Sequence, residues 1–312
     1  MGAAMKRVAI TGASGFVGGH LVRAAVAAGL EPVGYVRSER AAALVRDAGG
    51  APVDFAEEPA ALARSFEGAL AVVHLAQIGS ERGGHTYEAV NVGLTARVVE
   101  AARRAEVPSF VMFSGLGVAR YGQSRRVTTR YFLSKLTAET VAFGSGLDAA
   151  VFRPSYVVGP GDAFVPSVLR AMQAGEVERP GDGSYRMQPI AVADAAAAVL
   201  AAVARPPGAF PTVFDLVGPE PVAYARLLER LEAVARREGR PVRLRVREVK
   251  VAEAERLARS ETGYQGMGPD ELDCLLCDEV ADHAPLEALL ARPLVPLDEA
   301  LAAAVRASSE GA

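Results

Sequence analysis

Short apolar runs alternate with amphipathic stretches through the first half of the chain. The runs predict strands over residues 7–10, 32–36, 51–55, 71–75, 109–113 and 149–152. The stretches between them predict helices over residues 18–28, 40–48, 60–66, 87–105 and 131–143. The apolar runs lack alternation, which is typical of strands covered on both faces. This order of elements predicts an α/β fold with a doubly wound parallel Rossmann sheet.

The pattern loosens after Pro154 into segments rich in glycine and proline. A helix over 193–203 and a strand over 212–217 are expected to return to the sheet. A charged helix over 223–238, a strand over 242–251 and several short helices follow. We therefore expect a Rossmann domain over 1–155 and a smaller C-terminal α/β substrate lobe over 156–312, with 190–218 returning to the sheet.

Composition excludes several classes of function. Half of the 312 residues are hydrophobic, and the 34 lysines and arginines are slightly outnumbered by 37 aspartates and glutamates. This balance argues against a nucleic-acid partner. The basic cluster near residues 236–247 contains interspersed glutamates and is interpreted as a solvated face. No apolar stretch reaches the ~20 residues of a membrane span, and the N-terminus runs straight into a strand without an evident signal peptide.

Two cysteines, Cys274 and Cys277, form a C-x-x-C pair. A zinc site needs a second ligand pair and a redox site needs a thioredoxin-like context, and neither is visible. We interpret the pair as two partly buried helical cysteines, which indicates a reducing, cytoplasmic compartment. The four histidines lack metal-ligand spacing, so no metal site is expected.

A glycine-rich turn follows the first strand and leads directly into a helix. Gly12 allows a sharp turn, Gly15 allows close approach of a pyrophosphate, and Gly18 allows helix and strand to pack closely. The helix N-terminus offers free N–H groups to phosphates. The turn therefore predicts a dinucleotide site with contacts from Gly12, Ser14, Gly15, Phe16, Val17 and Gly18.

The end of the second strand bears on the choice of cofactor. Val36 stands where an acidic residue would bind a ribose 2′-hydroxyl, and Arg37 and Ser38 follow. A guanidinium there suits a 2′-phosphate, which favours NADP(H) and leaves NAD(H) possible; alternatively, Arg37 is a solvated loop charge. Asp54 either reaches the adenine amino group or caps the next turn. Contacts are also expected from Phe55, Leu75, Ala76 and Pro154.

Tyr131 and Lys135 lie four residues apart on one face of a predicted helix. A nearby ammonium lowers the pKa of a phenol, which allows proton exchange with a carbonyl or hydroxyl group. The same lysine can also bond a nicotinamide ribose. Both residues follow the fifth strand, whose end is expected to face the cofactor.

Five segments together resemble the short-chain dehydrogenase/reductase superfamily. They are TGASGFVGG at 11–19, HLA at 74–76, NVGLTA at 91–96, YFLSK at 131–135 and RPSYVVGPGD at 153–162. The resemblance is closest to the extended or atypical branch, of NAD(P)-dependent epimerase/dehydratase type. It implies Tyr131 as acid/base with Lys135 as its partner, and Asn91 as a structural residue near the site.

One departure from that pattern concerns the hydroxyl residue expected to bind the substrate carbonyl. Leu116 stands at its position, and Ser114, two residues earlier, is the remaining candidate on that segment, with Thr128 or Thr129 as substitutes. This departure and SGLD at 145–148 resemble an atypical subgroup that includes the Rossmann-fold accessory subunit of respiratory complex I. That resemblance implies a structural rather than a reacting NADPH.

Two hypotheses follow. The first is an NADP(H)-dependent oxidoreductase or epimerase acting on a carbonyl or alcohol of a small molecule, with Tyr131, Lys135 and Ser114 in catalysis. The second is an NADPH-binding accessory or assembly protein with little catalysis. A homodimer or a larger complex is compatible with both. Weaker expectations are pocket positions for Gln77, Tyr156 and Arg186, a place near the cofactor for His74, and a structural role for Asp194.

Overall fold

Seven parallel strands form the central sheet of the computed structural model, which describes residues 6–206, 208 and 213–308. Their order across the sheet is β11-β6-β5-β4-β1-β2-β3. The strands are β1 (Arg7–Thr11), β2 (Glu31–Val36), β3 (Ala51–Asp54), β4 (Ala71–His74), β5 (Phe110–Phe113), β6 (Ala149–Pro154) and β11 (Val213–Leu216). The predicted doubly wound parallel sheet is confirmed.

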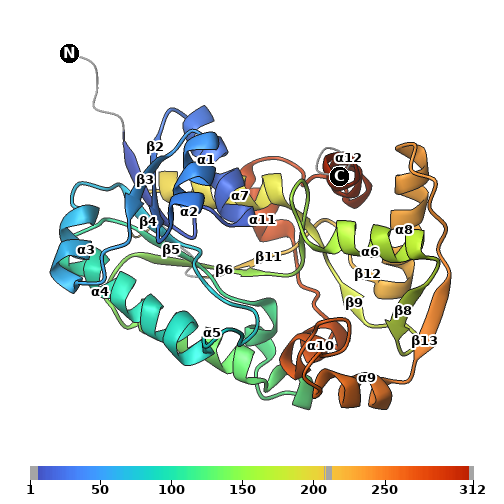
Figure 1. The fold of residues 1–312 in the computed structure, drawn as a ribbon. Helices are drawn as coiled ribbons and strands as arrows, with labels where there is room; N and C mark the ends of the chain where they lie inside the picture. Colours follow the sequence, from blue (N-terminus) through green and yellow to red (C-terminus); the bar gives the residue numbers. More distant parts are fainter. Residues whose placement is uncertain (1–5, 207, 209–212, 309–312) are drawn as a thin grey trace.

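Helices cover both faces of this sheet (Figure 1). One layer consists of α1 (Phe16–Ala27), α2 (Glu39–Asp47), α7 (Val192–Ala204) and α11 (Ala284–Leu290). The other consists of α3 (Pro59–Phe66), α4 (Thr95–Arg104) and α5 (Arg130–Phe143). Val8 and Ile10 of β1 pack into the first layer, whereas Ala9 packs into the second. Both faces of the strand are buried, which explains the unbroken apolar runs in the sequence.

The helix predicted over 87–105 is interrupted. It begins with a π-helix, η1 (Glu88–Leu94), and continues as α4. The widened turn carries Asn91, whose amide group accepts from the Ile78 N–H at 2.9 Å and donates to the Ile78 carbonyl at 3.0 Å. The same Asn91 amide nitrogen donates to Ser134 of α5 at 3.1 Å. The interruption therefore joins the loop after β4 to α5.

The second half forms a lobe beside the sheet, with its own apolar core (Figure 1). Its helices are α6 (Phe164–Ala174), α8 (Tyr224–Arg237), α9 (Val251–Ala258), α10 (Pro269–Leu276) and α12 (Leu297–Ala307). Its short strands are β7 (Val157–Val158), β8 (Val177–Pro180), β9 (Arg186–Met187), β10 (Ile190–Ala191), β12 (Val222–Ala223) and β13 (Val246–Val249). The boundary at residue 155 stays a prediction.

Two predicted strands differ in extent. The strand expected over 242–251 is only β13, because its single partner is the short β8 and Val251 already begins α9. The strand expected over 212–217 is β11, which pairs with β6; Thr212 lies outside the described residues. Within the described part of the chain, no helix is long and apolar enough to cross a membrane.

Asp194 fastens the C-terminal segment to the sheet domain. Its fully buried carboxylate accepts from the Val295 N–H at 2.7 Å and pairs with Arg292 at 2.7 Å. Asp194 lies in the first turn of α7, which packs against α1. One buried charge thus ties the segment between α11 and α12 to the Rossmann core, the structural role expected for it.

Replacing Asp194 by alanine is expected to lower the free energy of unfolding by about 2–3 kcal/mol, because the Val295 N–H and the Arg292 guanidinium lose their partner. Urea denaturation measures the change. Glu39→Ala is the matched control, since the Glu39–Arg46 pair is largely exposed, and its unfolding midpoint is expected to stay at the wild-type value. Equal unfolding midpoints for the two variants would contradict the stabilising role of Asp194.

Candidate functional site

The turn after β1 brings three backbone segments into close contact. Gly12 has φ +74°, and a Cβ there would lie 2.7 Å from the Ala76 nitrogen. A Cβ on Gly18 would lie 2.1 Å from the Gly12 carbonyl oxygen. Both positions therefore require glycine. Gly15 donates to Gly12 at 3.0 Å and precedes α1, whose first turn has no side-chain cap and so presents its N–H groups to an anion.

A cavity of about 300 Å³ opens beside this turn, at the carboxyl ends of the first strands. Of the predicted cofactor contacts, it is lined by Gly12, Ser14, Arg37, Ser38, Phe55 and Ala76. Gly15, Phe16, Val17 and Gly18 belong to the turn and the start of α1, and Leu75 donates to the Thr11 carbonyl at 3.0 Å. Asp54 is exposed at the end of β3 and does not line the cavity.

Arg37 lies at the mouth of this cavity. Its guanidinium carbon is 5.4 Å from the centre of the Phe55 ring, and Arg97 lies 5.7 Å from the same ring. Ser38 is the N-cap of α2, and its hydroxyl accepts from the Ala41 N–H at 3.3 Å. A cation and a helix N-terminus therefore meet at the end of β2, a combination that suits a phosphate group.

Lys135 is buried beneath the site, with 2% of its surface exposed. Its ammonium donates to the Phe113 carbonyl at 2.9 Å and to the Gln77 side chain. Burial lowers the pKa of Lys135 to about 7, against the opposing charge of Glu139. Glu139 itself forms a two-point ion pair with Arg153, at 2.8 and 2.6 Å.

Tyr131 is the second residue of α5, which is capped by Thr129. Its ring contacts Phe132 and Tyr87, with centroids 5.2 and 5.8 Å away. Burial raises the pKa of Tyr131, and the neighbouring Cys274 and Glu279 raise it further. The sequence predicts that a nearby ammonium lowers the pKa of Tyr131. The structure raises it instead, because the side chain is buried and Lys135 is directed toward Phe113 and Gln77.

The segment after β5 has no side-chain hydroxyl beside Tyr131. Ser114 is fully buried, and its hydroxyl has no hydrogen-bond partner among the described residues. It lines neither the cavity beside the glycine-rich turn nor a second cavity, which borders Tyr131. A Cβ on Gly115, which has an extended backbone, would lie 3.6 Å from the Tyr131 hydroxyl. The position that faces Tyr131 is therefore 115 rather than the expected 116, since Leu116 is buried at the start of η2 (Leu116–Arg120).

The alternative hydroxyls are already engaged. Thr128 donates to the Arg125 carbonyl at 2.8 Å, and Thr129 accepts from the Phe132 N–H at 3.2 Å as the cap of α5. Neither lines the cavity beside Tyr131.

That second cavity has a volume of about 330 Å³ and lies between the sheet and the lobe. Tyr131 and Gly115 form one side. The cavity lining also includes Gly79, Phe132, Pro154, Ser155, Tyr156, Met267, Glu271, Cys274 and Glu279. The sequence predicts Tyr156 as a pocket residue and Pro154 as a cofactor contact, and it does not mark the residues from α10 and the loop after it. Arg186, by contrast, lines neither cavity and pairs with Asp278 at 2.7 Å.

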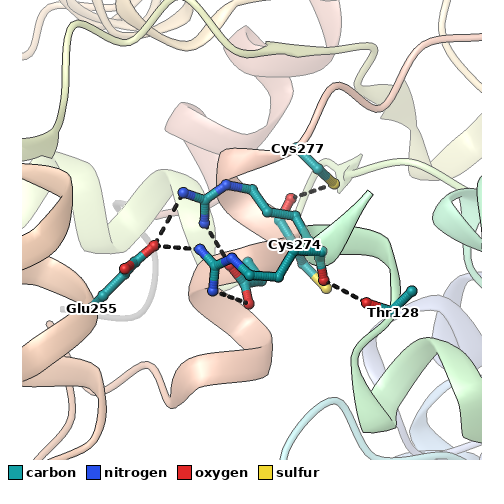
Figure 2. A network of polar contacts seen from close by, with 7 residues as sticks. Thr128, Glu255, Cys274 and Cys277 are labelled. Atoms are coloured by element: carbon teal, nitrogen blue, oxygen red, sulfur yellow. Dashed lines mark hydrogen bonds and ion pairs between the residues drawn. The ribbon is translucent and has the colours of Figure 1, made fainter. Parts of the chain in front are cut away.

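An ion-pair cluster holds α10 against this site (Figure 2). Arg125 and Arg126, from η3 (Arg125–Val127), both reach Glu255 of α9, at 2.6 and 3.1 Å. Arg126 also pairs with Asp273 of α10. Cys274, next in the chain, lines the cavity, while the Cys277 thiol donates to the Cys274 carbonyl at 3.2 Å. Burial raises the pKa of both thiols, which disfavours the reactive thiolate.

Glu279 follows α10 and had no motif that marked it in the sequence. Only 7% of its surface is exposed. Burial raises its pKa to about 8, against the opposing charge of Arg120. Its carboxyl group is therefore largely protonated at neutral pH.

His74 is a structural residue. Thr95 donates to the Asn91 carbonyl at 2.7 Å, so its hydroxyl accepts from His74 Nε2 at 3.0 Å. His74 Nδ1 is then the acceptor for the Thr11 hydroxyl at 2.7 Å. Burial lowers the pKa of His74 to about 3, so the ring stays neutral and joins β1, β4 and α4.

The stability of a Glu279→Gln variant relative to wild type is expected to depend on pH. Folding raises the pKa of Glu279 from 4.5 to about 8. Between these values folding takes up a proton, so the free energy of unfolding of wild type falls as pH rises. The variant lacks this titration, so its free energy of unfolding should increase relative to that of wild type by at most about 1.4 kcal/mol per pH unit in this window. Urea denaturation from pH 4 to 9 measures the difference; a gap that is constant across the window would contradict the shift.

Comparisons with known proteins agree with this arrangement. The model of the NAD dependent epimerase/dehydratase family matches residues 8–214. A 4-hydroxy-2-methyl-3-oxo-4-farnesyl-3,4-dihydroquinoline-1-oxide ketoreductase of Stigmatella aurantiaca is 30% identical over 65% of this chain and 66% of its own length. A ceramide reductase of Caulobacter vibrioides is 32% identical over 62% of this chain and 60% of its own length.

The fold is shared with solved structures. The UDP-glucuronic acid 4-epimerase of Bacillus cereus, in complex with NAD, superposes with a TM-score of 0.74 at 18% identity, covering 97% of this chain and 99% of its own. The narrower resemblance to the complex I accessory subunit stays a prediction. The match of the family model over more than half of the chain shows that this chain belongs to the NAD-dependent epimerase/dehydratase family.

Proposed function

We propose that this protein is an NADP(H)-dependent oxidoreductase that acts on a carbonyl or alcohol group of a small molecule. The observation that carries the proposal is the position of Tyr131. Its side chain lines the 330 Å³ cavity, one helical turn before the lysine that reaches Phe113 at the end of β5. A proton donor thus borders a space large enough for a small substrate. The names of the two curated relatives support reduction as the reaction.

The residues present fit a dinucleotide. The turn after β1 leaves no room for a side chain at Gly12 or Gly18 and directs the start of α1 toward a pyrophosphate. The 300 Å³ cavity would take the adenosine part, with Arg37 and the N-terminus of α2 next to a 2′-phosphate. When bound, the nicotinamide supplies or accepts a hydride.

The chain's own residues handle the proton. In the reducing direction the carbonyl carbon gains the hydride, and the carbonyl oxygen takes the proton from the Tyr131 hydroxyl, which leaves a phenolate that water reprotonates. Lys135 lies four residues later on the same helix. When it is protonated, it supplies the positive charge of the tyrosine–lysine pair. Ser114 is withdrawn from the cavity, so substrate orientation falls to Tyr131 and to the residues of the lobe.

Arg37→Ala is expected to weaken NADPH binding about tenfold and to leave NADH binding unchanged, because only NADPH carries the phosphate that a guanidinium would bind. Enhancement of nicotinamide fluorescence measures both affinities, and the absence of tryptophan from the chain removes indole emission.

Arg97→Ala is the matched control. Arg97 flanks the same Phe55 ring but pairs with Glu57, so the ratio of the two affinities should stay as in wild type. A wild-type protein that binds NADH more tightly than NADPH would overturn the NADP(H) preference.

Tyr131→Phe tests the reaction itself. NADPH oxidation by a panel of ketones is expected to fall at least about a hundredfold, because the variant has no proton to donate. NADPH binding should not change, since Tyr131 lines the second cavity rather than the first. Full turnover by the variant would refute the role of Tyr131.

A second candidate function is an NADPH-binding accessory protein. The glycine at position 115 favours it, because no hydroxyl from that segment assists Tyr131. NADPH that co-purifies with wild-type protein and is not oxidised by any ketone of the panel would support this alternative.

A further inference from the structure

Two carboxyl side chains line the cavity beside Tyr131, and they differ in their surroundings. Glu271 is engaged: its carboxylate accepts from Arg82 at 3.0 Å and from the Gly268 N–H at 2.8 Å. Glu279 is 7% exposed and borders the cavity, and its carboxyl group makes no hydrogen bond or ion pair with any residue that the structure describes. Its oxygens are not among the fully enclosed polar atoms that lack a partner, so they remain open to a ligand in the cavity.

The backbone of Glu279 is held in place. Its N–H donates to the Arg186 carbonyl at 2.7 Å, and its carbonyl accepts from the Ser155 hydroxyl at 3.4 Å. Met187 forms a β-bridge with the same residue. The carboxyl group therefore belongs to a preformed wall of the cavity, and a ligand would not have to order it first.

The wall around Glu279 lacks a positive charge. Tyrosine, serine, cysteine, methionine and proline side chains make up most of the lining, and no lysine or arginine is part of it among the described residues. Lys135 is directed to the Phe113 carbonyl, and Arg120 acts on Glu279 only from outside the lining. An anionic group placed here would lose its water without gaining a counter-charge.

We propose that Glu279 binds a hydroxyl group of the substrate next to the reacting carbon, so that the cavity selects uncharged hydroxylated ketones or alcohols and rejects carboxylates. The proposal rests on the proposed function for the identity of the reacting group, because Tyr131 and Glu279 share one cavity. It adds the chemical class of the substrate.

A protonated carboxyl group matches a hydroxyl group well. Each has one donor and at least one acceptor, so two complementary hydrogen bonds are available. Burial keeps the Glu279 carboxyl in this form at neutral pH. A substrate hydroxyl would supply the partner that the folded chain does not, whereas a methyl group in its place would leave the carboxyl unpaired.

Binding of three matched ketones to NADP⁺-loaded protein tests the proposal without requiring turnover. Acetone, hydroxyacetone and pyruvate differ only in the group beside the carbonyl, and saturation-transfer NMR titrations give the affinity of each. Wild type is expected to bind hydroxyacetone about tenfold more tightly than acetone, and pyruvate least tightly. Glu279→Leu should remove the preference for hydroxyacetone, whereas Glu279→Gln, whose amide both donates and accepts, should retain it.

Glu271→Gln is the matched control, a second carboxyl of the same lining that already has partners, and it should keep the wild-type order of affinities. NADPH fluorescence verifies that each variant folds. Equal affinities for acetone and hydroxyacetone, tightest binding of pyruvate, no binding of hydroxyacetone, or a preference that survives Glu279→Leu would each overturn the proposal. Failure of NADPH oxidation alone overturns the proposed reaction and leaves this binding result standing, so the two failures are distinguishable.

Discussion

The bond between the Lys135 ammonium and the Phe113 carbonyl, 2.9 Å long, is the contact on which the site depends. An amino group that is buried this deeply needs hydrogen-bond partners, and Phe113 and Gln77 provide them. The bond fixes α5 over the end of β5. Because Tyr131 lies one helical turn earlier, it then faces the space between sheet and lobe. The same placement brings position 115 within contact distance of the Tyr131 hydroxyl.

The parts of the structure that follow from local chemistry were predictable from the sequence. Strands buried on both faces appear as unbroken apolar runs, and Gly12 and Gly18 stand where any Cβ would meet backbone. The turn and the parallel sheet therefore follow from short segments. The π-helix around Asn91 was not predictable in this way, because the Asn91 side chain that it carries bonds to Ile78, thirteen residues away in the chain.

The same distinction explains the residues that sequence reasoning missed. A count along the segment placed the missing hydroxyl at 116, but the residue that faces Tyr131 depends on how β5 ends and η2 begins. Glu279 lies in a loop more than a hundred residues beyond β6, and backbone contacts with Arg186 and Ser155 hold it at the cavity. Burial, rather than the neighbouring residues in the sequence, determines the protonation state of the Glu279 carboxyl group and therefore which groups it can bind.

Burial also affects three titratable groups at the site in a consistent way. It favours the neutral form of Lys135 and the protonated forms of Tyr131 and Glu279. Each of these forms is the uncharged one. Proton donation by Tyr131 leaves a phenolate, and alcohol oxidation starts from that same phenolate, so burial opposes the charged form of Tyr131 in both directions of the proposed reaction. A carbonyl oxygen whose carbon gains a hydride becomes an alkoxide, which is basic enough to take a proton even from a phenol of raised pKa. The resting site therefore holds Tyr131 as the proton donor that carbonyl reduction requires, and burial destabilises the phenolate after the transfer, until water reprotonates it.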